Sequence, residues 1–268
     1  MAIEATPESL AARRQGDARP QSSSVGSGVD SRVTIVHGFA QTSACIGPLA
    51  DALAERHDLV LADAPGHGGS RRHLEADLEI GGDLLAATGG HSTYIGYSMG
   101  GRLSLHTALR HPGRVERLVL ISATAGIEDD RERSERLDRD ERHATRLEQI
   151  GLDAFIEEWL ALPLFAGLPS WARFDAERRA NSVEGLAGSL RHAGTGSMQP
   201  LWDRLSEIEC PVLIVTGSSD ERYEDLGARM ASTIGPSARH VSVPVAGHST
   251  HLEQPSRTTA AILEFLGS

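Results

Sequence analysis

Short apolar runs recur along the chain with helix-like stretches between them, and this order constrains the fold more than any other feature. Short, continuously apolar strands that alternate with helices form a parallel sheet that is covered by helices on both faces. The sequence therefore predicts an α/β fold with a mostly parallel sheet. We expect strands at residues 33–36, 59–62, 93–97, 118–121, 212–215 and 240–243, and helices near residues 48–54 and 80–87, directly after the third strand to about residue 109, and at 256–265.

One long segment breaks this alternation, because residues 127–205 show helical patterning only. The segment contains a charged run at residues 128–133 and an apolar stretch at residues 159–165. A helical insertion between two strands is expected over the carboxyl edge of the sheet, which is where open α/β sheets bind ligands. We therefore predict a helical lid at about residues 127–205.

The start of the chain has a different composition from the rest. Residues 1–30 are rich in Ser, Gly, Ala, Arg and Pro and show no sustained apolar period. This composition predicts a disordered N-terminal tail. We expect order to begin at Arg32, and a single α/β-hydrolase-like domain to occupy residues 31–268.

The basic residues limit the possible chemistry. All 26 Lys and Arg residues of the chain are Arg. A chain without Lys cannot form a P-loop, a Schiff base or a pyridoxal-phosphate site, because each of these needs the Lys amine. The formal net charge of −11 argues against a partner that is a nucleic acid or an anionic membrane, since both require a positive face. A local group of Arg side chains remains compatible with a small acidic substrate.

Cysteine usage and hydropathy bear on the compartment. Cys45 and Cys210 lie far apart and outside any Cys-x-x-Cys pair, so no zinc ribbon or redox motif is indicated. Two packed thiols in a reducing cytosol are the expected state. The N-terminus lacks an apolar signal region, and no stretch approaches the roughly 18 apolar residues of a membrane span. The sequence predicts a cytoplasmic protein and leaves monomer and homo-oligomer equally open.

The motif Gly96-Tyr97-Ser98-Met99-Gly100 matches the pattern G-x-S-x-G. The pattern alone is weak, but here it joins a predicted strand directly to a predicted helix. A nucleophile elbow needs this context, because the Ser sits on a sharp turn and the flanking Gly residues let the strand and helix approach closely. We therefore predict Ser98 as the active-site serine.

The order Ser, then Asp or Glu, then His is expected for a triad in this fold. Asp220 and His248 each follow a predicted strand, where loops project from a rigid scaffold. Asp220 is also placed to cap the next helix, and Asp225 or Glu221 are alternatives for the acid. His251 is the alternative base. We predict Asp220 as the acid, with these alternatives open, and His248 as the base, because His248 comes immediately after its strand.

Backbone N–H groups should supply the oxyanion hole. One is expected from Met99, the residue after the nucleophile, and the other from Phe39 in the loop after the first strand. His37, in the same loop, is expected to be structural.

Beyond the fold, the chain resembles the MenH family, the 2-succinyl-6-hydroxy-2,4-cyclohexadiene-1-carboxylate synthases of menaquinone biosynthesis. The likeness runs from about Arg32 to the C-terminus. The first and last of its motifs are shared with many α/β-hydrolases, whereas the Tyr before the Ser, the Arg four residues after it and the Arg-rich start of the lid are more specific. The motifs are Val36-His37-Gly38-Phe39, Gly96-Tyr97-Ser98-Met99-Gly100-Gly101-Arg102, Glu132-Arg133-Ser134-Glu135-Arg136 leading to Trp159 and Pro163-Leu164-Phe165, and Gly247-His248-Ser249-Thr250-His251-Leu252-Glu253-Gln254-Pro255.

This resemblance implies an α/β-hydrolase fold that acts as a lyase without a metal or cofactor. The family eliminates pyruvate from 2-succinyl-5-enolpyruvyl-6-hydroxy-3-cyclohexene-1-carboxylate. By motif position Arg102, Arg136 and Arg179 would hold the carboxylates of the substrate, and Tyr97 and Trp159 would also line the pocket. The family often has a Lys beyond the triad Asp, where this chain has Arg222, and the N-terminal segment has no counterpart in the family pattern.

The chemistry of the residues agrees with this implication. Arg binds carboxylates through two parallel hydrogen bonds, so a substrate with three carboxylates calls for several Arg side chains. An esterase for apolar esters has no use for them. The alternative function is a serine hydrolase of the same fold that cleaves an ester or a carbon–carbon bond, and the Arg set separates the two interpretations. A non-catalytic binding protein of this fold is disfavoured because the elbow and the Ser, Asp and His residues are all present.

Overall fold

The structure, a computed structural model, describes residues 1–16 and 32–267. Its centre is an eight-stranded sheet with the order β1-β2-β4-β3-β5-β6-β7-β8. The strands from β4 to β8 in this order are all parallel, which confirms the predicted fold class. The strands are β1 (Ala2–Ile3), β2 (Ala12–Gln15), β3 (Val33–Val36), β4 (Leu59–Ala62), β5 (Ser92–Tyr97), β6 (Val115–Ile121), β7 (Val212–Gly217) and β8 (Ala238–Val243).

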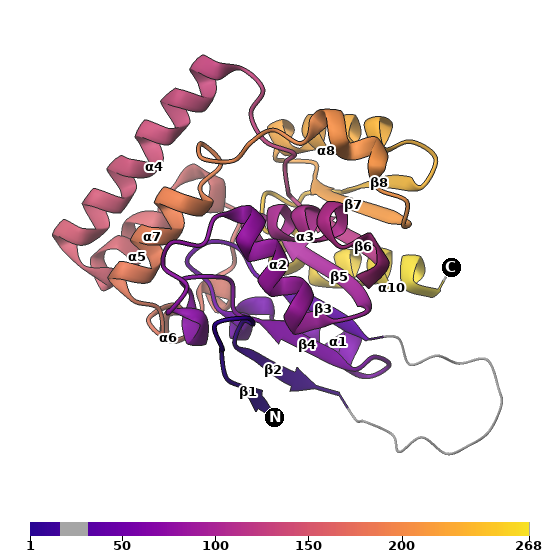
Figure 1. The fold of residues 1–268 in the computed structure, drawn as a ribbon, viewed down its shortest axis with the longest axis horizontal. Helices are drawn as coiled ribbons and strands as arrows, with labels where there is room; N and C mark the ends of the chain where they lie inside the picture. Colours follow the sequence, from indigo (N-terminus) through magenta and orange to yellow (C-terminus); the bar gives the residue numbers. More distant parts are fainter. Residues whose placement is uncertain (17–31, 268) are drawn as a thin grey trace.

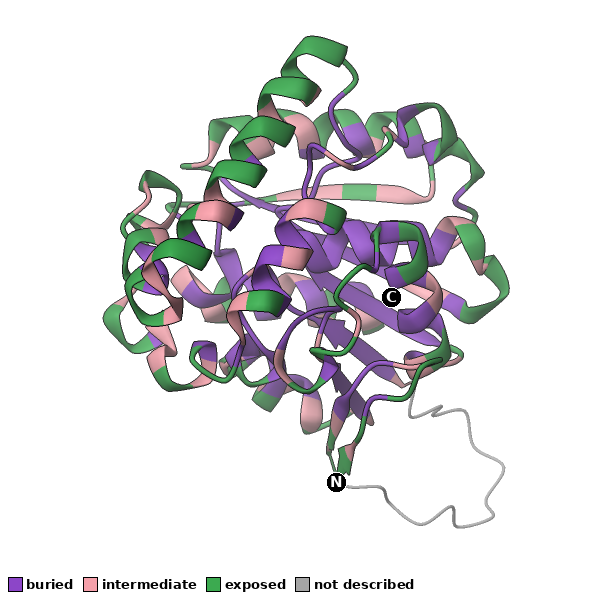
Figure 2. Ribbon diagram, turned by 60° about the vertical axis from the view of Figure 1, so that its left-hand side comes forward, coloured by how far each residue is buried: buried purple, intermediate pink, exposed green. Residues whose placement is uncertain are grey.

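Helices pack on both faces of this sheet and create two hydrophobic cores. Successive strand residues point to opposite faces, so that Val36 and Ile214 contribute to one core and Ile35 and Val215 to the other. The helices around these two cores are α1 (Pro48–Ala54), α2 (Leu78–Gly89), α3 (Met99–Arg110), α8 (Glu221–Ile234), α9 (Thr250–Glu253) and α10 (Pro255–Gly267). Strands β3, β4, β5 and β7 are buried along their whole length (Figure 2).

Between β6 and β7 the described chain contains helices and loops but no strand. In Figure 1 the helices gather beyond one end of the sheet. The α-helices of this insertion are α4 (Asp130–Ile150), α5 (Leu152–Leu160), α6 (Asp175–Arg178) and α7 (Val183–Ala193). Helices α4, α5 and α7 share a third, smaller core that includes Phe155 and Leu186 and reaches the loop after β3 through Ala40. Short 3₁₀ helices complete the fold at Ser43–Ile46, Gly68–Ser70, Pro112–Arg114, Pro163–Phe165, Ser170–Arg173 and Trp202–Glu207.

Helix α4 is the longest helix of the protein, with 21 residues, and most of its length is exposed (Figure 2). Its buried residues are Asp140, Ala144 and Leu147, which lie on one face. A helix that buries so narrow a stripe packs along one side only. Within residues 1–16 and 32–267, no helix is both long and apolar enough to cross a membrane.

The expectation of a disordered tail is wrong for residues 1–16. Strand β2 pairs antiparallel with β4, and β1 pairs with β2, so this segment extends the sheet at its edge. The side chain of Leu10 is fully buried, and its backbone N–H donates to Oγ1 of Thr88 at 2.8 Å. Main-chain pairing and the buried Leu10 side chain hold this segment in place without a sustained apolar period. The remaining part of the predicted tail, residues 17–30, lies outside the described residues.

Candidate active site

Ser98 occupies the sharp turn between β5 and α3. Its backbone angles are φ 52° and ψ −108°, a conformation that is strained for a residue with a side chain. A Cβ on Gly96 would lie 2.3 Å from the carbonyl oxygen of Gly100, and a Cβ on Gly100 would lie 2.3 Å from that of Val36. Both positions therefore require Gly, and the turn has the geometry of a nucleophile elbow.

Ser98, His248 and Asp220 form a continuous hydrogen-bonded series. Nε2 of His248 lies 3.1 Å from Oγ of Ser98, and Nδ1 of His248 lies 2.9 Å from Oδ2 of Asp220. Because an ionised carboxylate can only accept hydrogen bonds, Nδ1 carries the proton and Nε2 is left to accept from the Ser98 hydroxyl. The three residues follow β5, β8 and β7, whose carboxyl ends meet at one edge of the sheet.

The alternative residues considered for this arrangement lie elsewhere. Glu221 and Asp225 are exposed on α8. His251 is buried beneath the site, and neither of its ring nitrogens has a hydrogen-bond partner among the described residues. Asp220 performs both functions expected of it, since its Oδ1 caps α8 by accepting from the N–H of Tyr223 at 3.4 Å while Oδ2 contacts His248.

The N–H groups of Phe39 and Met99 belong to residues that line the cavity at Ser98. Met99 is the first residue of α3, so its N–H has no partner within the helix. The loop that carries Phe39 is fixed by two buried imidazoles: Nε2 of His67 accepts from the N–H of Ala40 at 3.2 Å, and Nε2 of His37 accepts from the N–H of Ala64 at 3.1 Å. His37 thus has a structural position, and burial lowers the pKa of both imidazoles.

The cavity next to Ser98 is small, with a volume of about 90 Å³, and insertion residues form much of its wall. Arg102 lines it, and the Arg102 side chain is almost completely buried although it forms no ion pair with any described residue. Burial, followed by the nearby positive charge of Arg136, lowers the pKa of Arg102 to about 10. The cavity is lined by Phe39, Ser98, Met99, Arg102, Thr124, Arg136, Asp140, Trp159, Leu164, Ser189, Leu190, Ala193, Gly194, Thr195, Tyr223 and His248.

Arg136 enters the same cavity from α4, and Trp159 enters it from α5. Nε of Arg136 donates to Oδ1 of Asp140 at 2.8 Å. The ring of Trp159 packs edge-on against Phe39, with 4.9 Å between ring centroids, and this contact joins the insertion to the loop after β3. The structure therefore brings Arg102, Arg136 and Trp159 together, as the sequence predicts.

Two residues expected in the substrate pocket do not line the cavity. Tyr97 is buried below it, where its hydroxyl lies 2.7 Å from Oγ of Ser249 and its ring packs against His248. Tyr97 is the last residue of β5 and packs into the same core as Ile95, two residues earlier on the same strand face, whereas Ser98 lies past the strand in the turn. Arg179 is exposed at the end of α6 and pairs with Asp153 at 2.9 Å. The structure therefore does not bring Arg179 together with Arg102 and Arg136 in the cavity at Ser98.

Three residues contribute to the site that the sequence patterns did not identify. Tyr223 lines the cavity and packs its ring against that of His248, with 4.5 Å between centroids. The carboxylate of Glu253 accepts the N–H groups on both sides of His248, from Gly247 at 2.7 Å and from Ser249 at 2.9 Å. Asp140 is a buried carboxylate inside the cavity. Its spacing of four residues from Arg136 on a predicted helix was the only available signal.

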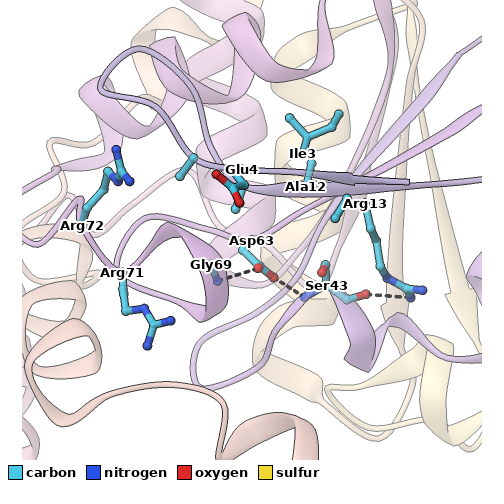
Figure 3. A pocket seen from close by; sticks show the side chains of 12 residues that line it. Ile3, Glu4, Ala12, Arg13, Ser43, Asp63, Gly69, Arg71 and Arg72 are labelled. Atoms are coloured by element: carbon cyan, nitrogen blue, oxygen red, sulfur yellow. Dashed lines mark hydrogen bonds between the residues drawn. The ribbon is translucent and has the colours of Figure 1, made fainter.

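Two further cavities adjoin the one at Ser98. A cavity of about 270 Å³ shares Thr124, Arg136, Thr195 and Tyr223 with it, and another of about 260 Å³ shares Leu164 and His248. A cavity of about 530 Å³ lies apart from Ser98 between the N-terminal strands and the loop after β4 (Figure 3). Figure 3 shows Asp63 between Ser43 and Gly69, whose N–H groups its carboxylate accepts.

Comparison with known proteins places this site in a family. A family model described as alpha/beta hydrolase fold matches residues 32–255. Together with the parallel sheet, the elbow and the hydrogen-bonded Ser98, His248 and Asp220, this match defines the class of the chain as an α/β-hydrolase-fold protein.

Several more similar relatives carry the name of one enzyme. A Bacillus subtilis (strain 168) protein that carries the name 2-succinyl-6-hydroxy-2,4-cyclohexadiene-1-carboxylate synthase as a provisional assignment is 35% identical over 262 residues, which cover 91% of this chain and 93% of the relative. The synthase of that name from Pectobacterium atrosepticum is 30% identical over 217 residues, or 78% and 83% of the two chains. The structure of MenH from S. aureus has a TM-score of 0.86 and 27% identity, and the match covers 96% of this chain and 97% of that one. The chain belongs to the 2-succinyl-6-hydroxy-2,4-cyclohexadiene-1-carboxylate synthase family, and the resemblance found in its motifs is confirmed.

Proposed function

We propose that this protein is a 2-succinyl-6-hydroxy-2,4-cyclohexadiene-1-carboxylate synthase, a lyase that eliminates pyruvate from 2-succinyl-5-enolpyruvyl-6-hydroxy-3-cyclohexene-1-carboxylate. The observation that carries the proposal is the presence of Arg102 and Arg136 in the same cavity as Ser98. Family membership supports it independently. Two guanidinium groups in one cavity suit a substrate with carboxylates, whereas a neutral ester has no carboxylate for them to bind.

In this proposal Ser98 acts as a base. His248, oriented by the Asp220 carboxylate, takes the hydroxyl proton of Ser98. The Ser98 oxygen then removes the ring proton that lies between the succinyl ketone and the ring double bond. The electron pair of that carbon–hydrogen bond moves toward the ketone, and the resulting enolate oxygen accepts hydrogen bonds from the N–H groups of Phe39 and Met99. One preorganised donor of this kind is typically worth about 3–4 kcal/mol.

Collapse of the enolate completes the elimination. The ketone forms again, a carbon–carbon double bond forms at the deprotonated position, and the original ring double bond shifts by one carbon. The electrons of the shifted bond expel the enolpyruvyl oxygen, so the carbon–oxygen bond breaks and the enolate of pyruvate leaves. That enolate takes up one proton to become pyruvate, which balances the proton removed by Ser98. No acyl-enzyme forms, and the reaction requires no redox partner.

The Arg residues hold the carboxylates of the substrate in this account. The cavity at Ser98 is smaller than the roughly 300–1,000 Å³ of typical ligand pockets, so the ring with its substituents extends into the adjoining cavity that shares Arg136 and Tyr223. The indole N–H of Trp159 is buried without a partner among the described residues. A polar substrate atom that satisfies it would remove a desolvation cost of about 1–3 kcal/mol.

Product analysis tests this function. The purified protein is incubated with the pathway substrate, and the products are identified by mass spectrometry, with Ser98→Ala as the control. We expect pyruvate together with a ring product that keeps its succinyl group. Release of succinate without pyruvate would instead indicate a hydrolase that uses Ser98 as a nucleophile.

A further inference from the structure

Both oxygen atoms of the Asp140 carboxylate are held in place. Oδ1 accepts from Nε of Arg136 at 2.8 Å, and Oδ2 accepts from the N–H of Gly196 at 3.2 Å. The side chain of Asp140 is 2% exposed, whereas that of Arg136 is 27% exposed. Asp140 is therefore the fixed partner of this pair, and Arg136 is the partner that reaches toward the opening.

We propose that Asp140 is a positioning residue that aims the Arg136 guanidinium at a carboxylate of the substrate. This inference rests on the proposed function, because it concerns how that substrate is held. Asp140 acts through Arg136, since its own negative charge would repel an acidic ligand.

The placement of Asp140 is difficult to explain by stability alone. Burying a carboxylate carries a desolvation penalty that its ion pair often fails to recover, and an exposed pair at the same i, i+4 spacing already gives a helix its modest gain. Helix α4 contains such an exposed pair, in which Nε of Arg131 lies 2.9 Å from Oε1 of Glu135. The buried pair thus differs from its neighbour on the same helix by facing the cavity.

The charges in the cavity explain why Arg136 needs an anchor. Arg102 and Arg136 both line this space, and like charges repel. Arg102 is fixed by its bond from Nη1 to the carbonyl oxygen of Ala193 at 2.7 Å. Without Asp140, Arg136 would be free to turn away from Arg102 toward solvent. With it, two guanidinium groups and one carboxylate leave a net positive charge that an incoming carboxylate neutralises.

The variant Asp140→Asn separates positioning from a structural role. An Asn side-chain oxygen can still accept from the N–H of Gly196, so the link between α4 and residues 194–197 is retained. Its amide group cannot accept from Arg136, because both groups are donors. Glu135→Gln is the matched control, since it breaks a pair of the same spacing on the same helix outside the cavity.

Steady-state kinetics of pyruvate release give the first measurement. We expect Asp140→Asn to raise KM for the pathway substrate about tenfold, at the lower end of the effect of one charge-assisted contact, with kcat changed much less. Glu135→Gln should leave both constants unchanged. Adding Asp140→Asn to an Arg136→Gln background should have almost no further effect, because the residue through which Asp140 acts is already lost.

Other outcomes would overturn the inference. A loss in kcat with unchanged KM, or full additivity in the double variant, would mean that Asp140 supports the fold and does not aim Arg136. Failure of the wild-type protein to release pyruvate refutes the proposed function instead. In that case calorimetric titration with succinate still tests whether Asp140 positions Arg136. Weaker binding of succinate to Asp140→Asn than to Glu135→Gln supports this role, and equal binding excludes it.

Discussion

Nη1 of Arg102 donates a hydrogen bond to the carbonyl oxygen of Ala193, 2.7 Å away, and this bond joins the helix after Ser98 to the last residue of α7. Arg102 is 7% exposed and forms no ion pair with any other residue that the structure describes. Buried guanidinium groups are normally paired with carboxylates. The missing counter-charge is what an acidic substrate supplies in the proposed function.

The variant Arg102→Ala should therefore separate the two kinds of substrate. Loss of one charge-assisted contact predicts a fall in kcat/KM for the pathway substrate of roughly ten- to a hundredfold. Cleavage of p-nitrophenyl acetate, which has no carboxylate to bind, should change little. Arg179→Ala is the control, because Arg179 is exposed and pairs with Asp153 outside the cavity. Equal losses on both substrates would make Arg102 a structural support of the elbow.

The residues Ser98, Asp220 and His248 should behave as a unit. Ser98→Ala, Asp220→Asn and His248→Ala are each expected to lower kcat by about 10³- to 10⁶-fold while the circular dichroism spectrum is retained. A double variant should lose barely more than its worse single variant, because each removes the same proton path. Additive losses in kcat would argue against a shared role for these residues.

Buried neutral imidazoles should make the protein sensitive to acid. Burial lowers the pKa of His67 and of His251 to about 3 and that of His106 to about 4. In the unfolded chain these groups take up protons below their usual pKa of about 6.5, whereas in the folded chain they do not. The free energy of unfolding should therefore fall as pH drops from about 6.5 toward 4, by up to about 1.4 kcal/mol per pH unit for each group. Urea denaturation between pH 7.5 and 5 measures this slope.

The variant His106→Leu provides the internal comparison for that slope. It removes one buried imidazole whose Nε2 has no partner among the described residues. Its pH dependence should be flatter than that of the wild type. A wild-type free energy of unfolding that stays constant from pH 7.5 to 5 would show that these imidazoles are not held neutral by burial.

The N-terminal strands should contribute to stability. Leu10 is fully buried against the main domain. Leu10→Ala is expected to cost about 2–5 kcal/mol and to lower Tm by about 2–4 °C for each kcal/mol at this chain length. Arg14→Ala, an exposed position on strand β2 four residues later, serves as the control. Equal Tm values for Leu10→Ala and wild type would mean that residues 1–16 do not pack stably.

Much of this architecture could be read from local patterns. The strand that ends at Tyr97 and the helix that begins at Met99 were identifiable because buried parallel strands are continuously apolar and the Gly residues punctuate the turn. Ser98, Asp220 and His248 followed from their places just after strands. The place of Arg102 near the site could be predicted because it follows Ser98 by four residues along one helix.

The rest depends on contacts between distant segments. Strand β2 lies between β1 and β4, one strand in from the edge of the sheet, and its bonds to β4 are made by the main chain, so its polar sequence gave no signal. Arg179 and its neighbour Arg178 lie next to each other in sequence, yet Arg178 is buried and donates to the carbonyl oxygen of Ala40 while Arg179 faces solvent. Which of two adjacent Arg residues turns inward is decided by tertiary packing. The same holds for Tyr223, whose position depends on how Asp220 caps the start of α8.

The most direct measurement compares two reactions of the wild-type protein under the same conditions. Pyruvate release from 2-succinyl-5-enolpyruvyl-6-hydroxy-3-cyclohexene-1-carboxylate and hydrolysis of p-nitrophenyl acetate are each followed to obtain kcat/KM. If elimination is the true activity, kcat/KM for the pathway substrate should be about 10⁴ M⁻¹ s⁻¹ or more, within the usual enzyme range. The kcat/KM for the ester should be at least about a hundredfold lower, because the ester lacks the carboxylates that the Arg residues hold. Efficient ester hydrolysis with no release of pyruvate would contradict the account and identify the protein as a serine hydrolase.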